Sequence, residues 1–299
     1  MAIARRVLVI VLALGVVLRA APQPAPRVIS LIPAVTEMLF AMGAGADVIG
    51  VSSFDRFPPE VSSRQKVGGL LDPDTERILA LRPTLVVIYE TQFELRDRLA
   101  AAGIPTWPYR HGSIASIYET ILGLGHALGR TADGEALTRR MQQEIADVRG
   151  ALRDQPAVRT LFVISRDGGA LQHLDVAGGD GFLNEIIELA GGVNVFRDVA
   201  RPAVDASTEE VLARRPEAIL ELWANRRLDA ATRQREVAVW NALPAVPAVH
   251  NHRIFEINDE RLAIPGPRLP DGVRLFASLL HPDAVYQAAS NPQAPQTPQ

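Results

Sequence analysis

The sequence predicts an α/β protein of two similar lobes with mainly parallel sheets, joined by a single long backbone helix. The segment TERILALRP at Thr75–Pro83 recurs as TEEVLARRP at Thr208–Pro216, an offset of 133 residues. Apolar runs typical of strands alternate with helical patterns, which indicates parallel sheets covered on both faces. The copies lie too far apart for neighbouring solenoid units, whose periods are about 20 to 50 residues. Two lobes that share a pattern explain the repeat better.

Length and composition agree with two lobes of ordinary domain size. The chain has 299 residues, of which 47% are hydrophobic and 22% charged, as is typical of globular proteins. Its formal net charge is −3, or −6 when Arg5, Arg6 and Arg19 of the N-terminal segment are left out. A mildly acidic chain with one lysine, Lys66, has no electrostatic footprint for nucleic acid. The absence of cysteine excludes thiol catalysis, cysteine-ligated metal and a lipid anchor on cysteine.

Residues 1–21 are similar to a secretory signal peptide. Arg5 and Arg6 precede an unbroken apolar run, Val7–Leu18, which Ala20 and Ala21 follow. This run is shorter than the roughly 20 residues that a membrane-spanning helix needs, so a retained anchor is the lesser alternative. We therefore predict export to the periplasm.

The N-terminal lobe is predicted over residues 27–130. Arg27–Ile32 is expected to form a buried strand that ends at Pro33, and a helix follows from Thr36 to Gly43. Later strands are expected at 48–51, 85–88 and 104–109, with helices at 93–102 and 114–128. Ligands of such sheets bind beyond the carboxyl ends of the strands. The candidate contacts at those ends are Pro33, Ala34, Phe54, Arg56, Tyr89, Phe93, Tyr109 and Arg110.

A long amphipathic helix is predicted over residues 131–153, between the two lobes. Its apolar positions recur at spacings of three and four residues from Leu137 to Leu152, which makes one stripe. At 1.5 Å per residue the helix spans about 33 Å, the width of a domain. We interpret it as a rigid connector that packs along both lobes, with an ordinary core helix as the alternative.

The C-terminal lobe is predicted over residues 158–285, because Arg159–Ile164 repeats the first strand at an offset of 132. A helix is expected from 181 to 190, the second repeat follows it, and Arg253–Ile257 forms another strand. Arg166, Asp259, Arg261 and Arg268 lie in loops that follow strands and extend the list of candidate contacts. Residues 286–299 are rich in Gln, Pro and Ala without periodicity and are expected to form a disordered tail.

Signatures of catalysis are missing from the sequence. It contains no G-x-S-x-G, H-E-x-x-H or P-loop motif, and only His250 and His252 lie close together among its six histidines. Two hypotheses from other classes stay open. A two-lobed enzyme requires a polar triad between the lobes, and a zinc or manganese receptor requires three converging His or carboxylate ligands.

Three segments carry a family resemblance. These are RVISLIPAVTEMLFAMGAGADVIGVSS, KVGGLLDPDTERILALRPTLVVI and STEEVLARRPEAIL. Over about residues 27–285 the chain resembles the substrate-binding proteins of cobalamin and iron-siderophore ABC importers. The resemblance implies two α/β lobes on a backbone helix, a chelate held between them, no catalysis and no cofactor. It also implies that Glu76 and Glu209 dock onto arginines of the membrane permease.

The expected ligand is the point at which this sequence departs from the family pattern. Cobalamin binders often carry aromatic residues in the cleft, yet this chain has Arg201–Val204 before the second repeat and Glu260-Arg261 after Asp259. Arginine forks favour an anionic ligand such as a siderophore or haem propionate, whereas the N-terminal lobe favours cobalamin. We expect a monomer that binds cobalamin, with ferric siderophore or haem as the first alternative and zinc or manganese as the second.

Overall fold

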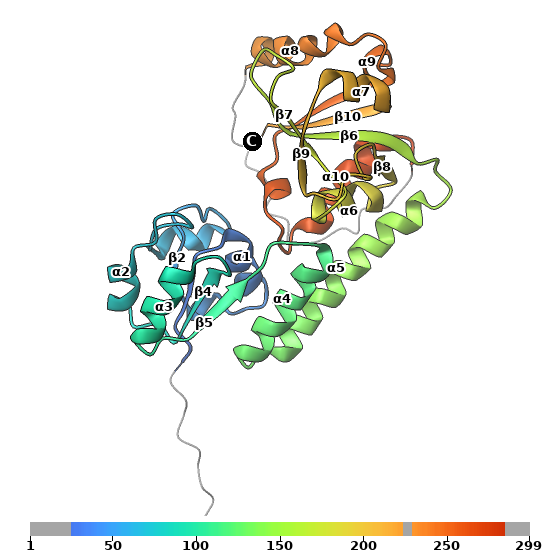
Figure 1. The fold of residues 1–299 in the computed structure, drawn as a ribbon. Coiled ribbons are helices and arrows are strands. Elements are labelled where there is room, and N and C mark those ends of the chain that lie inside the picture. The colour runs from blue at the N-terminus through green and yellow to red at the C-terminus, as the bar shows by residue number, and fades with distance from the viewer. Residues whose placement is uncertain (1–24, 224–228, 285–299) are drawn as a thin grey trace, which may run out of the picture.

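The computed structural model describes residues 25–223 and 229–284 (Figure 1). The predicted signal peptide and disordered tail lie outside this range. Within it, the N-terminal lobe has a five-stranded sheet in the order β3-β2-β1-β4-β5, and all pairings are parallel. Its strands are β1 (Val28–Ser30), β2 (Val48–Val51), β3 (Gln65–Lys66), β4 (Leu85–Tyr89) and β5 (Thr106–Tyr109).

Helices cover both faces of this sheet, and the side chains of its central strands are therefore buried on both sides. Every residue of β1 is buried, as are Val86, Val87 and Ile88 of β4, which is the pattern of a parallel strand between two helical layers. The described helices of this lobe are α1 (Pro33–Ala41), α2 (Thr75–Ala80), α3 (Phe93–Ala101) and α4 (Ile114–Ala127). The predicted elements of the N-terminal lobe are present, and the short strand β3 adds to them.

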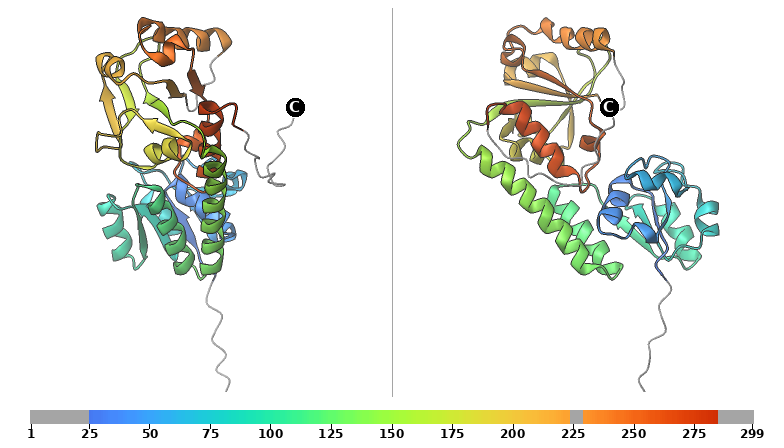
Figure 2. Two further views of the ribbon diagram at one scale, coloured as in Figure 1. Left: turned by 90° about the vertical axis from the view of Figure 1, so that its right-hand side faces the viewer. Right: turned by 180° about the vertical axis from the view of Figure 1, so that it is seen from behind.

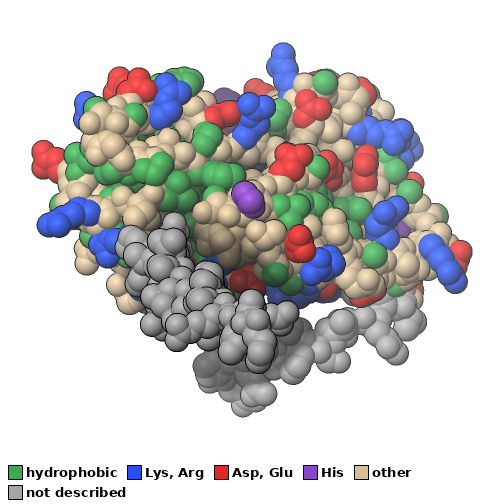
Figure 3. Space-filling model, turned by 90° about the horizontal axis from the view of Figure 1, so that it is seen from below, with side chains coloured by type: hydrophobic (Ala, Val, Ile, Leu, Met, Phe, Trp, Pro, Cys, Tyr) green, Lys and Arg blue, Asp and Glu red, His purple; other side chains and the backbone are tan. Residues whose placement is uncertain are grey.

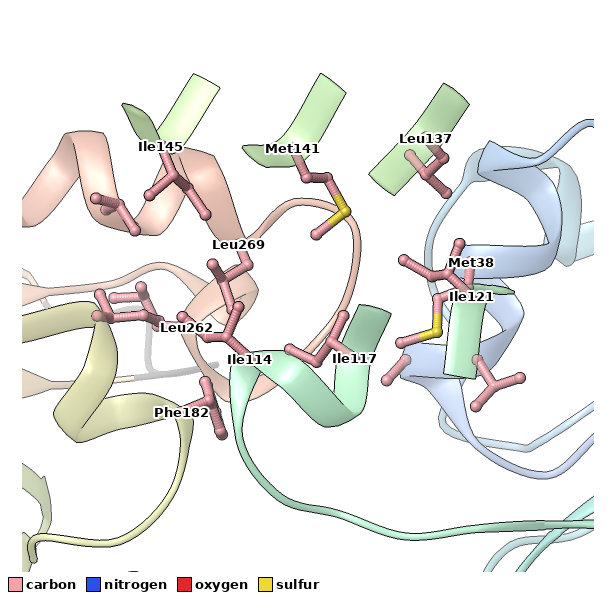
Figure 4. Packing of buried hydrophobic residues seen from close by; sticks show 14 of the residues in the cluster. Met38, Ile114, Ile117, Ile121, Leu137, Met141, Ile145, Phe182, Leu262 and Leu269 are labelled. Atoms are coloured by element: carbon pink, nitrogen blue, oxygen red, sulfur yellow. The ribbon is translucent and has the colours of Figure 1, made fainter. Parts of the chain in front are cut away.

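Helix α5 (Thr131–Leu152) joins the lobes and confirms the predicted long helix. Its apolar stripe is buried along its whole length, from Leu137 to Leu152. Figure 4 shows Leu137 near Met38 of the N-terminal lobe and Ile145 near Leu269 of the C-terminal lobe. Figure 2 shows α5 running beside α4 and reaching α10. One helix therefore contributes to the cores of both lobes.

The C-terminal lobe has a mixed sheet in the order β11-β10-β6-β7-β9, with β8 paired to β6, among the residues described. Strand β7 is antiparallel to both β6 and β9, and the other pairings are parallel. Its strands are β6 (Val158–Ser165), β7 (Leu174–Ala177), β8 (Gly192–Asn194), β9 (Ala203–Ala206), β10 (Ala218–Leu222) and β11 (Ile254–Ile257). The sheet is thus less parallel than its partner in the N-terminal lobe.

Helices of the C-terminal lobe pack on this mixed sheet and against α5. Helix α10 contacts both α5 and α6, and its buried residues include Phe276, which packs against Phe162 of β6. The described helices are α6 (Phe182–Leu189), α7 (Thr208–Arg214), α8 (Ala230–Ala238), α9 (Pro247–His250) and α10 (Leu269–Leu280).

The two copies of the repeat are held by equivalent arginines. Arg27 Nε donates to the carbonyl of Arg82 at 3.2 Å, and Arg159 Nε donates to the carbonyl of Arg215 at 3.5 Å. Arg82 and Arg215 both end their helices in the left-handed conformation, with φ of 45° and 48°. The repeat in sequence is therefore a repeat in backbone conformation and capping.

The surface carries charges of both signs. Seen from below, basic and acidic side chains alternate with apolar ones without a large field of one sign (Figure 3). In the part of the chain that the structure covers, no helix combines the length and apolar character that a membrane crossing requires.

Candidate functional site

Loops that follow strands of the two sheets meet each other. The segment after β11 reaches from the C-terminal lobe to α1, where Arg268 Nε donates to Glu37 Oε2 at 2.8 Å in the middle of the helix. The side chains of Glu37 and Arg268 are only 2% and 16% exposed. A Cβ on Gly266 would lie 3.4 Å from Glu37 Oε2, so this segment follows α1 closely. The carboxyl ends of β1 and β11 therefore lie on facing surfaces.

Pro33 and Ala34, two of the predicted contacts, form the first turn of α1 in this region. Proline is well suited to the first helical position because no intrahelical partner exists for an N–H there. Ala34 is buried, and its carbonyl oxygen would lie 3.6 Å from a Cβ on Gly266. The start of α1 is therefore in contact with the C-terminal lobe.

Apolar side chains are exposed where the strands of the N-terminal lobe end. Phe54 after β2 is 66% exposed, Phe93 after β4 is 56% exposed, and Leu71 after β3 is 94% exposed. A pocket of about 490 Å³ between the loops after β3 and β4 is lined by Leu70, Leu71 and Phe93, among others. Exposed apolar groups in such number favour a binding surface. We call Phe54, Leu70, Leu71 and Phe93 the apolar rim.

Hydrogen bonds fix the loops that carry the apolar rim. Gln92 Nε2 donates to the carbonyl of Leu70, and the backbone N–H of Tyr89 donates to Gln92 Oε1, both at 2.9 Å. A Cβ on Gly69 would lie 2.7 Å from the Phe54 ring, so glycine lets that ring lie against the backbone. The rim is therefore built on ordered loops.

A run of four rings crosses from one lobe to the other. Tyr89 contacts Tyr109 edge to face with centroids 5.6 Å apart, Tyr109 contacts His111 at 6.5 Å, and His111 contacts Phe182 of α6 at 5.5 Å. We call these four residues the ring row. Burial raises the pKa of both tyrosines and lowers the pKa of His111. All four side chains are therefore uncharged at neutral pH.

Asp55 lies beneath this surface, between Phe54 and Arg56 of the loop after β2. It is 4% exposed, and both carboxylate oxygens lack a hydrogen-bond partner within the described chain. Burial raises its pKa to about 6, although Thr36 and Lys66 oppose that rise. Lys66 Nζ donates to the backbone carbonyl of Asp55 at 2.9 Å and so closes the loop.

The predicted arginine contacts fall into different environments. Arg56 is exposed on the same loop as Phe54. Arg110 is exposed and pairs with Glu90 at 2.9 Å. Arg166 is buried in the C-terminal lobe, with 1% of its side chain exposed, and pairs with Glu221 at 2.7 Å. Ligand contact by Arg166 remains a prediction, but the guanidinium is already surrounded by protein groups.

Asp259 and Arg261 form a local pair after β11. Arg261 Nε donates to both carboxylate oxygens of Asp259, at 2.8 and 2.9 Å, and Arg261 also pairs with Asp271 at 3.3 Å. Burial opposes ionisation of Asp259, but the hydrogen bonds from Arg261 outweigh it and hold the pKa below its usual value. Both residues are half-buried on the side of the C-terminal lobe that approaches α1.

The two predicted docking carboxylates are exposed in the first turns of equivalent helices. Glu76 follows the N-cap Asp74, which accepts from the N–H of Arg77 at 3.0 Å. Glu209 follows the N-cap Ser207, which forms a capping box with Glu210. These N-caps do not use Glu76 or Glu209. Thr208 Oγ1 donates to Glu209 Oε2 at 3.3 Å, and both carboxylates are exposed on the surface.

Sequence reasoning did not include several residues of this surface. Leu70 and Leu71 stand inside the quoted family segment but are not among the predicted contacts. His111 follows two assigned residues directly. Phe182 gave no signal, because its approach to His111 depends on the packing of the lobes. Within residues 25–223 and 229–284, no cluster of three or more His, Asp or Glu could hold a metal ion.

Comparisons with known proteins match this fold over most of its length. The model of a family described as "Periplasmic binding protein" matches residues 28–260. The vitamin B12-binding protein of Vibrio cholerae (strain O395) is 26% identical over 269 residues, which cover 88% of this chain and 92% of that protein. That of Pectobacterium atrosepticum is 30% identical over 247 residues, covering 81% and 84%. The structure of a periplasmic haem-binding protein from Roseiflexus sp. RS-1 is 28% identical with a TM-score of 0.71, covering 88% of this chain and 100% of that chain.

Proposed function

The chain belongs to the periplasmic binding protein family, and from this premise we propose that it captures cobalamin between its lobes and delivers it to a membrane permease. As a member it is the substrate-binding component of an ABC importer, acts outside the cytoplasm and is not an enzyme. The proposal concerns the ligand, the residues that contact it and the residues that dock.

The observation that carries the cobalamin proposal is the similarity to two vitamin B12-binding proteins over more than four fifths of the chain. The apolar rim and the ring row support it physically. A corrinoid is large and has a flat macrocycle with neutral amide side chains, so it needs broad apolar contact rather than charge. Phe54, Tyr89 and Phe93 supply such contact where strands end. We propose Pro33, Ala34, Tyr109, Arg56 and Arg110 as further contacts from this lobe.

The C-terminal lobe supplies the opposite wall in this proposal. Asp259 and Arg261 stay proposed contacts because they follow β11 on the side facing α1, where the Asp259 side chain is 17% exposed and the Arg261 side chain is 37% exposed. Arg166 is a weaker proposal, because its guanidinium is enclosed by Glu221 and Glu236. We assign it mainly to the stability of the lobe.

Haem is the second candidate ligand. The haem-binding protein from Roseiflexus is 28% identical to this chain, and Arg56 and Arg110 lie on the loops that carry the flat rings, where propionates would pair with them. A ferric siderophore of catecholate type would use the same arginines. A bare zinc or manganese ion has less support, because no cluster of three or more His, Asp or Glu occurs among the described residues.

Calorimetric titration of the purified protein with cyanocobalamin, haemin and a ferric catecholate tests the choice. We expect heat of binding with cyanocobalamin at micromolar protein. No signal with cyanocobalamin, together with clear binding of either iron compound, would overturn the cobalamin proposal. Stoichiometric bare zinc in the purified protein would overturn any chelate.

Replacement of Phe54 by Ala tests the site itself. The change removes one flat, exposed ring and should weaken cyanocobalamin binding roughly tenfold, or about 1.4 kcal/mol. Leu122→Ala is the matched control, because Leu122 is an exposed apolar residue of α4 away from the strand ends. Equal affinities of the two variants would remove Phe54 from the site.

A further inference from the structure

His111 is the member of the ring row that can bond to a metal. It follows β5 by two residues, in the segment that leads to α4. Its ring is held edge to face by Tyr109, at an interplanar angle of 76°, and by Phe182 of the other lobe, at 81°. Rings from both lobes therefore fix the imidazole, although the residue as a whole is exposed.

The imidazole of His111 keeps its bonding capacity. Within the described chain no hydrogen bond of either ring nitrogen occurs, whereas His173 pairs with Asp167 and His281 contacts the carbonyl of Gly191. Partial burial lowers the pKa of His111, so the neutral ring with a free lone pair prevails at neutral pH. Neutral imidazole is a preferred ligand of transition metals.

The surroundings of His111 suit a flat metal chelate. Tyr89 and Tyr109 continue the ring row into the N-terminal lobe. The apolar rim lies at the same edge of this sheet: Phe93 follows β4, the neighbour of β5, and the rest of the rim follows β2 and β3 on the far side of β1. A metal ion alone would find no second and third ligand among the described residues. A chelate that already fills its equatorial positions needs only one nitrogen from the protein.

We propose that His111 is a ligand-contacting residue that gives an imidazole nitrogen to the central metal of a planar tetrapyrrole with an exchangeable axial position. The nitrogen replaces an axial water molecule, which leaves, and the metal keeps its oxidation state. This inference rests on the proposed function, since it requires a tetrapyrrole between the lobes. The same chemistry applies to a corrinoid and to haem, and the probes below separate them.

The alternative role for His111 is packing between the lobes. His111→Phe separates the two roles, because phenylalanine keeps an aromatic ring between Tyr109 and Phe182 but has no nitrogen. His126→Phe is the matched control, since His126 is an exposed histidine near the end of α4. The probes are diaquocobinamide, whose cobalt has axial waters, haemin, and cyanocobalamin, whose axial positions are both filled.

Absorption spectra during titration give the readout. For diaquocobinamide, haemin or both, we expect the wild type and H126F to shift the absorption bands as imidazole ligation does. H111F should lose that shift and bind roughly tenfold more weakly, or about 1.4 kcal/mol. Cyanocobalamin affinity should be the same in the wild type and H126F, and any loss in H111F measures the packing contribution of the ring, because both axial positions of that cobalt are filled. A shift with one probe alone assigns the site to a corrinoid or to a porphyrin.

Two results would overturn the proposal. The first is that H111F gives the same absorption shift as the wild type with both diaquocobinamide and haemin. The second is that the wild type shows no ligation bands while H111F binds all three probes more weakly. That second result would mean that His111 acts by packing alone. Failure of the cobalamin proposal looks different, as the wild type would then give no heat with cyanocobalamin. Haemin ligation through His111 in that case would still support this inference.

Discussion

Asp55 is a buried carboxylate whose ionisation should oppose folding. Its pKa is raised from 3.8 to about 6, mainly by burial. A raised carboxyl pKa favours the folded state only while the group is protonated, and that contribution is lost as the pH rises from 3.8 through about 6. Above pH 7 the buried charge costs about 3 kcal/mol, at about 1.4 kcal/mol for each pH unit between the two values.

Asp55→Asn should therefore stabilise the protein at pH 8 and have little effect at pH 4. Denaturant unfolding of both proteins across this range measures the difference. Asp154→Asn is the control, because Asp154 is 86% exposed and its replacement should give a small difference without a step near pH 6. A less stable D55N at pH 8 would show that the carboxylate has a favourable partner.

Replacement of Arg166 by a neutral residue should lower the stability of the C-terminal lobe rather than remove a ligand contact. It pairs with Glu221 at 2.7 Å and Glu236 at 3.0 Å, and Trp240 Nε1 donates to Glu221 at 2.9 Å. Arg166→Met would leave Glu221 buried without its cation, at a cost of about 3 to 5 kcal/mol. Adding Glu221→Met should recover part of that loss in urea unfolding. Full stability of R166M, with lost ligand affinity, would place Arg166 in the site.

The positions of Phe54 and Tyr89 could be predicted because each follows an apolar run that can only be a buried strand. The environment of Arg166 could not be predicted. Its acidic partners lie 55 and 70 residues later in the sequence, and many other carboxylates lie between, so the sequence does not single them out. The pair of Glu37 and Arg268 spans 231 residues. Local patterns place a residue at the end of an element, but they do not state which distant charge it meets.

At the scale of elements, the residues that follow α2 and α7 have a strained left-handed backbone conformation, which occurs in both copies of the repeat. Arg82 has φ of 45°, a conformation that costs a residue with a Cβ about 1 to 2 kcal/mol. Arg82→Gly should remove that cost and raise the free energy of unfolding by about 1 kcal/mol, after the greater entropy of glycine in the unfolded chain is subtracted. Its carbonyl still accepts from Arg27.

The control for Arg82→Gly is Arg98→Gly in α3, where the backbone is helical and glycine should cost about 1 kcal/mol. Denaturant unfolding of both variants gives opposite signs if conformation is the cause. Destabilisation of both would mean that the Arg82 side chain contributes more than the strain removes.

Element types were predicted best where apolar runs are long. β4 and β10 follow the repeat, and their buried residues leave no alternative to a strand. β7 and β9 were missed because each has four residues, and two of those in β9 are exposed, so neither shows an apolar run. Their antiparallel pairing makes the second sheet mixed, and it depends on contacts between strands rather than on either strand alone.

At the scale of the whole molecule, Glu76 and Glu209 place one carboxylate on each lobe. We expect Glu76→Gln and Glu209→Gln to leave ligand affinity unchanged and to lower uptake by cells, because neither residue caps its helix and both are exposed. A permease with paired positive charges would lose one contact with each change.

Glu119→Gln is the control for docking, since Glu119 is an exposed carboxylate in the middle of α4. Uptake and calorimetric affinity should be measured on the same variants. A tenfold loss of ligand affinity in E76Q or E209Q, about 1.4 kcal/mol, with normal uptake at saturating ligand, would assign that residue to the ligand site.

Each sheet is assembled from one uninterrupted stretch of chain, residues 28–109 and residues 158–257. Among the described residues no strand is exchanged between the sheets, and α5 lies between the two stretches. The two lobes can therefore be exchanged between related genes as separate modules. A single recombination point within α5 would join the N-terminal ligand surface of one protein to the C-terminal ligand surface of another. The chimaera must preserve the apolar stripe of α5 and the meeting of Glu37 with Arg268. Exchange of one lobe changes one side of the proposed ligand site and keeps the other, which offers a route to a new chelate specificity.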